Sequence, residues 1–318
     1  MALKDILPSR LGFGAAPLGN MFRAIPEDQA LATVEAAWKD GIRYFDNAPF
    51  YGAGLAEIRM GEALKEKPRD QYVISTKVGR IVLDELDQAR RDNGEKGDVF
   101  ANGRPNKVIN DYSHDATLRS IEESLKRLQT DRIDIVWVHD LAQDFYGDEW
   151  LARFEEARTG AFKALDRLRD EGTIKAWGLG VNRVEPVELL LDLDGPRPDG
   201  SLLAGRYTLL DHDRALERLM PKAAERGIGI VVGGPYSSGA LVGVHGSWNR
   251  QPPYAPEVAF FPWRNGTLGN QQTLVGGFQS DEGTRWGRPV AAVTGPDGAV
   301  YITDDYANAV YRLAPRTT

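Results

Sequence analysis

Short apolar runs alternate with amphipathic stretches along the chain from Leu11 to about Gly243. Each apolar run has the length of a β-strand, and each stretch between two runs has the length and spacing of a helix. Strands that alternate with helices in this way indicate parallel βαβ units. The seven strands that the pattern predicts span residues 11–18, 42–46, 72–77, 134–139, 175–181, 202–207 and 228–233.

The helices between these strands are predicted from apolar residues spaced three and four positions apart. The clearest helical face consists of Leu118, Ile121, Leu125 and Leu128, and further helical stretches span 31–38, 58–64, 162–169 and 216–226. A doubly wound sheet and a (β/α)8 barrel of the TIM type both begin with such units. No GxGxxG pattern joins the first strand to its helix, which argues against a dinucleotide-binding doubly wound sheet. The barrel is therefore the expected fold.

Two regions depart from this alternation. Residues 83–112 form a polar insertion with turn signals and no clear period, and we expect them to lie above the barrel mouth as a loop. After Gly243 the amphipathic helices disappear, and aromatic-rich runs are broken by turns such as Asp297–Gly298, which predicts an antiparallel β-meander. We therefore expect a barrel over residues 1–243 that lacks a recognisable eighth strand, followed by a β-rich tail over 244–318.

The composition narrows the possible classes of function. The chain has 318 residues, of which 42% are hydrophobic and 27% are charged, which is enough apolar material for a core. It carries 39 basic and 46 acidic residues, a net charge of −7, and no long Lys/Arg block, which argues against nucleic-acid and membrane partners. The absence of cysteine excludes disulfides and thiol chemistry, and four histidines make a metal site an unfavourable hypothesis. No signal-peptide or transmembrane pattern is found, so we expect a soluble, cytoplasmic protein.

Four polar residues lie at or just after the expected carboxyl ends of three consecutive strands, and they are Asp46, Tyr51, Lys77 and His139. In a parallel barrel these ends meet at one mouth, where such barrels hold their active sites. An ammonium lowers the pKa of a nearby phenol, a carboxylate holds the ammonium in place, and a neutral imidazole can orient a substrate oxygen. This set suits reduction of a carbonyl group or its reverse. The sequence contains no evident covalent nucleophile, so the electrons must come from a cofactor.

The segments around these residues resemble those of the aldo-keto reductases. GIRYFDNAPFYG, ISTKVGR and IDIVWVHD are similar to three signature segments of that family, and the resemblance covers residues 11–243. It implies a (β/α)8 barrel and hydride transfer that depends on NADP or NAD, with a small aldose or aldehyde as the substrate. It also implies that Tyr51 is the proton donor, Lys77 the group that adjusts its pKa, Asp46 the partner of Lys77, and His139 the orienting imidazole.

The resemblance is greatest to bacterial sugar 1-dehydrogenases that oxidise galactose or L-fucose at the anomeric carbon, on segments such as LGFGAAPLGNMFRA, LLAGRYTLLD and GGPYSSG. It implies that Asn182 binds the nicotinamide carboxamide, and that the turn containing Pro235, Ser238 and Gly239 approaches the pyrophosphate. The sequence departs from the family pattern at Val181, Ala204 and Gly233, where serine, glutamine and an aromatic residue are usual.

The tail resembles a different class of protein, the quinone-dependent β-propeller dehydrogenases, in segments such as HGSWNR, WGRPVAAV and DGAVYITDDYANAVYRL. About one blade matches, and a single blade closes no propeller. We therefore expect the chain to be a fusion of an aldo-keto reductase-like part with a propeller-like part. Three hypotheses follow: an NAD(P)-dependent aldose dehydrogenase, a non-catalytic or impaired fusion with an incomplete cofactor site, and a quinone-dependent dehydrogenase, which the missing blades disfavour.

Overall fold

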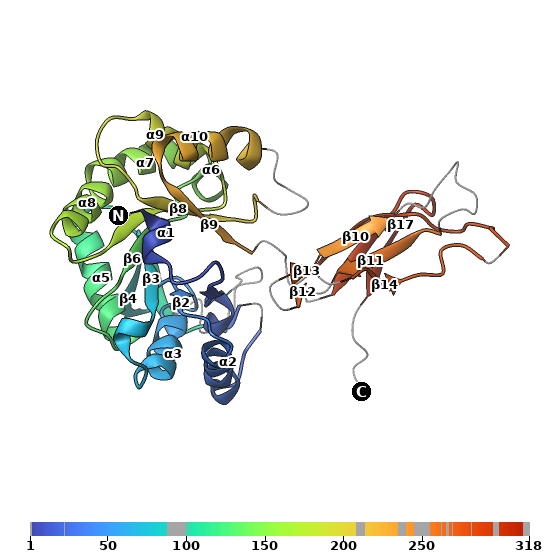
Figure 1. Cartoon of the computed structure of the whole chain (residues 1–318), viewed down its shortest axis with the longest axis horizontal. Helices are drawn as coiled ribbons and strands as arrows, with labels where there is room; N and C mark the ends of the chain where they lie inside the picture. The colour runs from blue at the N-terminus through green and yellow to red at the C-terminus, as the bar shows by residue number, and fades with distance from the viewer. Residues whose placement is uncertain are drawn as a thin grey trace. The chain divides into compact units, whose positions relative to one another are not determined.

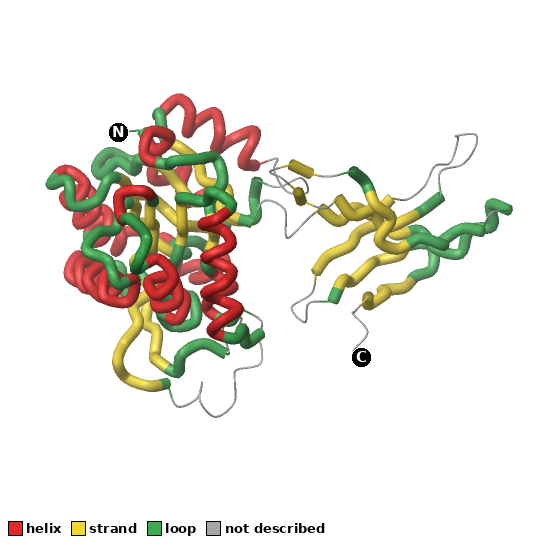
Figure 2. Tube along the Cα trace, turned by 60° about the horizontal axis from the view of Figure 1, so that its bottom comes forward, coloured by secondary structure: helices red, strands yellow, loops and turns green. Residues whose placement is uncertain are grey.

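The chain forms two compact units, Met1–Pro235 and Tyr236–Thr318, which we call unit 1 and unit 2 (Figure 1). The computed structural model describes residues 2–21, 23–87, 100, 102–207, 214–234, 240–244, 255–261, 263–264, 267–268, 270–280, 282–294 and 299–313. In unit 1, helices surround a central sheet, whereas the described part of unit 2 consists of strands and loops (Figure 2).

Unit 1 is built on a nearly closed sheet of seven parallel strands in the order β1-β2-β3-β6-β7-β8-β9. The strands are β1 Phe13–Gly14, β2 Tyr44–Asp46, β3 Val73–Val78, β6 Ile135–His139, β7 Ala176–Val181, β8 Gly200–Ala204 and β9 Gly229–Gly233. Each of the seven expected strands is confirmed, and each neighbouring pair is parallel. Within the described residues, no eighth strand joins β9 to β1.

Several of the expected elements differ in extent from the prediction, including the following three. The first strand ends at Gly14, and the chain turns into the 3-10 helix Ala16–Gly19, because Pro17 has no N–H to donate to a sheet. The strand expected over 202–207 ends at Ala204, since Gly205 adopts a positive φ of 69°. The helix expected over 216–226 begins with a π-helical segment, Ala215–Leu219, before α10 Met220–Arg226.

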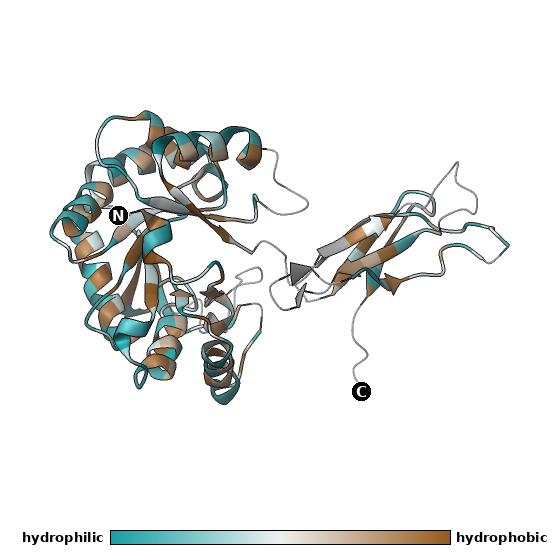
Figure 3. Cartoon of the chain, in the orientation of Figure 1, coloured by the Kyte–Doolittle hydropathy of each residue, from teal (hydrophilic) through white to brown (hydrophobic). Residues whose placement is uncertain are grey.

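Amphipathic helices cover the outside of the sheet. They are α2 Glu27–Lys39, α3 Leu55–Leu64, α5 His114–Leu128, α7 Trp150–Thr159, α8 Ala161–Asp170, α9 Glu185–Asp192 and α10. Their apolar faces and the outward side chains of the strands share one core, in which Phe162 stacks on Trp177 with ring centroids 5.4 Å apart. The polar faces of these helices are teal in Figure 3. No helix in the described residues is long and apolar enough to cross a membrane.

A second cluster fills the interior of the sheet, where the short helix α1 Leu3–Ile6 packs against inward side chains of the strands. Leu3 lies against Gly200 and Gly229, the first residues of β8 and β9. A Cβ at either glycine would lie within 3 Å of the Leu3 side chain, so glycine makes room for this contact. Helix α1 therefore closes the end of the sheet opposite the carboxyl ends of the strands.

The polar insertion contains structure that the sequence pattern did not predict. Strands β4 Arg80–Leu86 and β5 Asn106–Asn110 pair as an antiparallel ribbon. The turn from β3 into β4 contains Gly79, which has a φ of 96°, and a Cβ there would lie 2.1 Å from the ring of Tyr112. The insertion therefore leaves β3 in a fixed direction beside the carboxyl ends of the strands.

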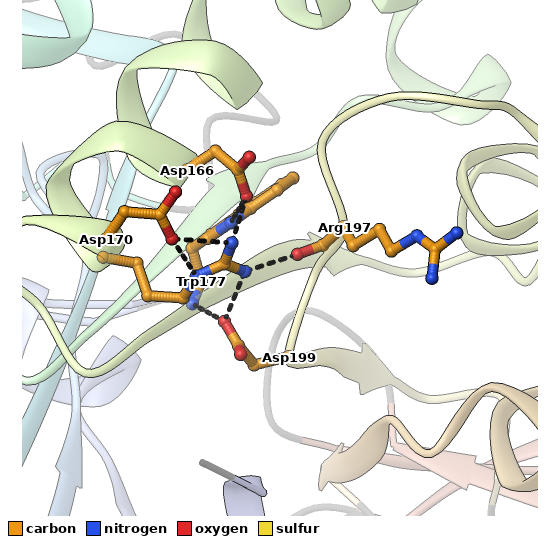
Figure 4. Close-up of polar contacts among 6 residues, drawn as sticks. Asp166, Asp170, Trp177, Arg197 and Asp199 are labelled. Atoms are coloured by element: carbon orange, nitrogen blue, oxygen red, sulfur yellow. Dashed lines mark hydrogen bonds and ion pairs between the residues drawn. The ribbon is translucent and has the colours of Figure 1, made fainter.

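A network of charged side chains attaches α8 to β7 and to the segment before β8 (Figure 4). Arg169 donates to Asp166 at 2.5 Å and to the carbonyl of Arg197 at 2.6 Å, and it lies 3.4 Å from Asp199. Asp166 and Asp199 in turn accept hydrogen bonds from the indole and backbone N–H groups of Trp177. One guanidinium thus fixes a helix to the start of a central strand.

The described residues of unit 2 form two three-stranded antiparallel sheets and a short ribbon. The strands are β10 Ala240–Val244, β11 Glu257–Phe261, β14 Gln272–Val275, β15 Pro289–Thr294, β16 Val300–Asp304 and β17 Ala309–Leu313, with β12 Trp263–Arg264 and β13 Thr267–Leu268 in the ribbon. Val258, Phe278, Ala292 and Ile302 form its core. The antiparallel meander is therefore present. The boundary expected after Gly243 falls inside β10, which pairs antiparallel with β11.

Candidate active site

Three neighbouring strands of unit 1 end in polar side chains at the same mouth of the sheet. Asp46 is the last residue of β2, Lys77 is the next to last residue of β3, and His139 is the last residue of β6. The parallel register places Asp46 opposite Ser75 and Lys77 opposite Trp137, so these strand ends lie side by side. The structure therefore brings three of the predicted catalytic residues together.

Lys77 is buried inside the mouth, with 2% of its side chain exposed. Its Nζ donates to Oδ2 of Asp46 and to the carbonyl of Asn47, both at 2.6 Å. The hydroxyl of Ser75 donates to Oδ1 of Asp46 at 2.6 Å, so both carboxylate oxygens are held. The stem of Lys77 passes Gly180 of β7, where a Cβ would lie 3.5 Å from Cε of Lys77, an ordinary van der Waals distance. The ammonium is thus fixed in position.

Tyr51 completes the group from the turn that follows β2. Nζ of Lys77 lies 4.8 Å from the Tyr51 ring centroid, close enough for its charge to act on the phenol. The His139 ring stands edge-on to the Tyr51 ring at 5.8 Å between centroids, with an interplanar angle of 84°. Phe100 covers another face of Tyr51 at 5.7 Å. All four residues predicted from the sequence therefore meet at one place.

The turn that carries Tyr51 depends on glycines. Gly52 has a φ of 64°, and a Cβ there would lie 2.3 Å from the carbonyl oxygen of Gly19. A Cβ on Gly103 would lie 2.6 Å from Cα of Gly52, and the N–H of Arg104 donates to the Gly52 carbonyl at 3.0 Å. Three stretches of backbone therefore pack without side chains next to Tyr51, and this close packing sets its position.

Burial and neighbouring charges set the protonation of the group. Burial raises the pKa of Tyr51, and the Lys77 ammonium opposes that rise. Burial alone would lower the pKa of Lys77, but the charge of Asp46 and the contact with Tyr51 raise it above its usual value. Burial and the charges of Lys77 and Arg80 lower the pKa of His139 well below its usual range. At neutral pH the site therefore contains a phenol, an ammonium and a neutral imidazole.

Three residues that the sequence reasoning did not single out surround His139. Tyr112 donates its hydroxyl to the His139 carbonyl at 2.7 Å. Oδ2 of Asp140 lies 3.4 Å from Nε2 of His139 and 2.9 Å from a terminal nitrogen of Arg80. Burial raises the pKa of Asp140 to about 6, although the positive charge of Arg80 acts to lower it. The sequence contained a signal for two of these residues. Asp140 directly follows His139, and Arg80 lies three residues after Lys77, so both come just after predicted strand ends.

This arrangement can move a proton to or from an oxygen atom in the mouth. A phenol held beside a fixed ammonium can give up and recover its proton more readily than an isolated phenol in the same buried place. A neutral imidazole can donate or accept a hydrogen bond without adding charge. The geometry suits the interconversion of a carbonyl and an alcohol.

Comparison with known proteins agrees with this chemistry. Residues 10–257 match the family described as the aldo/keto reductase family. The chain belongs to this oxidoreductase family. The matched range includes all four residues at the mouth and extends past unit 1 into the first strands of unit 2.

Two relatives of this aldo/keto reductase are dehydrogenases. The pyridoxal 4-dehydrogenase of Microbacterium luteolum is 40% identical over 247 residues, covering 74% of this chain and 69% of that protein. The D-threo-aldose 1-dehydrogenase of a Pseudomonas species is 39% identical over 237 residues, covering 73% of this chain and 67% of that protein. These relatives favour an oxidoreductase over a non-catalytic barrel.

A solved aldo/keto reductase from Klebsiella pneumoniae, in complex with NADP and acetate, shares the fold. It is 22% identical with a TM-score of 0.50, and the likeness covers 71% of this chain and 64% of that one. The aldo/keto reductase described here therefore spans less than two thirds of the length of this solved structure.

The residues expected to contact a nicotinamide cofactor are only partly described. Asn182 follows β7 at the same mouth, and in the described residues its side chain makes one long hydrogen bond, 3.5 Å, to Asp144. This weakly engaged amide has the donor and the acceptor that pairing with a carboxamide requires. Pro235, Ser238 and Gly239 lie outside the described residues. The donor set present fits a nicotinamide at the mouth.

Proposed function

We propose that this aldo/keto reductase oxidises an aldose at its anomeric carbon with NADP or NAD, and that it also runs the reverse reaction. The observation that carries the proposal is the meeting of Tyr51, Lys77, Asp46 and His139 at one mouth. The aldose substrate is favoured by the relative named D-threo-aldose 1-dehydrogenase and by a second sugar enzyme, the L-galactose dehydrogenase of Arabidopsis thaliana, at 30% identity.

Each of the four residues has a separate role in the proposed reaction. Tyr51 takes the proton of the anomeric hydroxyl during oxidation and returns it during reduction. Lys77 lowers the pKa of the phenol and so makes the phenolate accessible. Asp46 keeps Lys77 charged and fixed. His139, neutral and edge-on to Tyr51, orients the substrate oxygen.

We propose that Asn182 pairs with the carboxamide of the cofactor, and that the turn containing Pro235, Ser238 and Gly239 faces its pyrophosphate. When bound, nicotinamide supplies the two-electron redox chemistry that side chains lack. The chain's own residues fix the substrate oxygen between Tyr51 and His139 and handle the proton at that oxygen. The packed turn around Gly52 keeps the phenol in place while this happens.

The test is absorbance at the reduced-nicotinamide band with galactose, L-fucose, pyridoxal and simple aldehydes, each measured with NAD and with NADP. We expect oxidation of at least one of the two sugars and formation of a lactone. No absorbance change with any substrate in either direction would contradict the proposal and favour the non-catalytic fusion. Dye reduction that required added pyrroloquinoline quinone and calcium would instead favour the quinone-dependent hypothesis.

A further inference from the structure

A second charged pair lies at the mouth and has no part in the proton transfer described above. Arg80 begins β4, and Asp140 directly follows β6. Both side chains are largely buried, with 12% and 8% exposed, and a terminal nitrogen of Arg80 lies 2.9 Å from Oδ2 of Asp140. The same carboxylate oxygen lies 3.4 Å from Nε2 of His139. The pair therefore lies next to the residue that orients the substrate oxygen.

The Arg80 guanidinium contacts two aromatic rings. Its central carbon is 4.1 Å from the ring centroid of Phe50 and 4.7 Å from that of Phe145. Phe50 directly precedes Tyr51, and its ring centroid lies 6.1 Å from that of His139. With Arg80 in contact with both rings, the N–H donors of the guanidinium are the groups that can make further polar contacts.

The pair is incompletely hydrogen bonded. Nε of Arg80 is buried and has no hydrogen-bond partner among the described residues. A guanidinium has five N–H donors, and the contact with Asp140 uses only part of them. A buried charged group with unused donors is unfavourable for stability unless a ligand completes its hydrogen bonds. This incompleteness indicates a binding role and is poorly explained by a purely structural one.

The chemistry of the pair identifies the group that it would bind. Asp140 supplies a negative charge beside the positive charge of Arg80, so the site has little net attraction for an anion. A hydroxyl is different, because it can donate to the carboxylate and accept from the guanidinium at the same time. A hydroxyl on the carbon next to the reacting carbon would fall close to the oxygen held by His139.

We propose that Arg80 and Asp140 form a hydroxyl-binding site that selects substrates with a hydroxyl on the carbon adjacent to the reacting one. The inference rests on the proposed function and adds to it the residues that determine specificity. A site that hydrogen bonds a substrate hydroxyl discriminates strongly against an analogue without it, because its own polar groups are then left unpaired.

The test compares substrate pairs that differ by that hydroxyl, using the full chain. The pairs are galactose with 2-deoxygalactose in oxidation, and glyceraldehyde with propanal in reduction. We expect the wild type to prefer the hydroxylated member of each pair in kcat/KM. Arg80→Met and Asp140→Asn should each lower that preference by about ten- to a hundredfold. Activity on the member without the hydroxyl should fall by a smaller factor, because the part of the loss that acts through His139, whose pKa Arg80 helps to lower, is common to both members.

Two further measurements separate a failure of this inference from a failure of the proposed function or a general loss of activity. Arg153→Met is the matched control, because Arg153 also lies over an aromatic ring, that of Tyr146, but is partly exposed and paired with Glu156. It should leave the preference unchanged. Thermal-shift titration with each sugar provides a readout without turnover. A wild type that reduces aldehydes but oxidises no sugar would contradict the aldose proposal and leave the glyceraldehyde pair to decide the inference.

The inference is overturned by any of three results. The first is a wild type without preference in either substrate pair and without a difference in sugar binding. The second is an equal loss of activity on both members of a pair in Arg80→Met and Asp140→Asn, which would indicate a structural role. The third is an unchanged preference in both variants.

Discussion

At the residue scale, the mouth of unit 1 combines a buried ammonium with a phenol whose pKa is raised by burial. The ammonium remains charged because Asp46 and Tyr51 raise the pKa of Lys77 despite its burial. The same contact acts to lower the pKa of Tyr51, because the cation favours the phenolate. Proton transfer at this site therefore depends on one charge, that of Lys77, which Asp46 stabilises.

Replacement of Lys77 tests this dependence through the pH profile. In Lys77→Met the cation that lowers the pKa of Tyr51 is lost, so that pKa rises further. The phenolate fraction at a given pH falls, and the rise of the oxidation rate with pH moves to more alkaline values. We expect kcat/KM for oxidation near neutral pH to fall by about a hundredfold or more.

The matched control for this variant is Lys107→Met, because Lys107 is also paired with a carboxylate, that of Glu85 at 3.4 Å, but both of these side chains are exposed. It should leave the profile unchanged. Since Lys77→Met leaves a buried carboxylate without its partner, circular dichroism must first show that the variant is folded. A folded Lys77→Met protein with the wild-type pH profile would contradict the account.

The four residues of the site were predictable because strand ends and side-chain alternation are visible in the sequence. Ser75 and Lys77 are two positions apart on one strand and therefore point to the same face, and Asp46 ends the neighbouring strand. Parallel pairing of these strands then brings the three side chains together. The contacts of Arg80 were not predictable in the same way. One of its two aromatic partners, Phe145, belongs to a segment far away in the sequence, and only the fold brings them together.

At the element scale, the turn after β2 determines where Tyr51 lies. Gly52→Ala should be destabilising for two reasons, because it forces alanine into a left-handed conformation and places a Cβ against the Gly19 backbone. Gly41→Ala is the matched control, since Gly41 has a φ of 87° but a Cβ there would meet no neighbouring atom within 4 Å. In this control, only the strain of the left-handed backbone should lower the stability.

We expect Gly52→Ala to lose about 1–3 kcal/mol more unfolding free energy than Gly41→Ala in urea titrations. Its kcat should also fall, by up to about a hundredfold, because the neighbouring phenol is displaced. Gly41→Ala should retain kcat. Equal stability and equal kcat in the two variants would show that the close packing at Gly52 does not position Tyr51.

The strands of unit 1 were predicted well, because each is a short apolar run between helices. The ribbon of β4 and β5 was missed, since half of the residues in its strands are polar and a long segment separates the two strands in the sequence. Helix α9 was also missed. Its start, Glu185-Pro186, resembles a loop, although proline is favourable in the first turn of a helix.

At the scale of the whole molecule, unit 1 contains the site and unit 2 has an antiparallel fold of its own. Within the described residues, β1 and β9 are not joined by an eighth strand. The matched relatives also have sequence beyond the matched part, since 69% and 67% of their lengths are covered. The likeness of unit 2 to a propeller blade, and the origin of the chain as a fusion, remain predictions.

In the part of the chain that the structure describes, no strand lies between β9 and β1, and we therefore expect weak cofactor binding. Isothermal titration of the full chain with NAD and with NADP should give Kd values above about 100 µM, in the upper part of the range common for enzyme ligands. Binding of either cofactor at ordinary micromolar concentrations would show that this expectation is wrong.

The most direct test of the central claim is the steady-state rate of Tyr51→Phe, measured beside cofactor binding by the same protein. This substitution removes the phenol hydroxyl and retains the ring that packs against Phe100 and His139. We predict that kcat falls by about a thousandfold or more while the cofactor Kd stays within about twofold of wild type. Near-full turnover by the folded variant would contradict the claim that Tyr51 carries the proton.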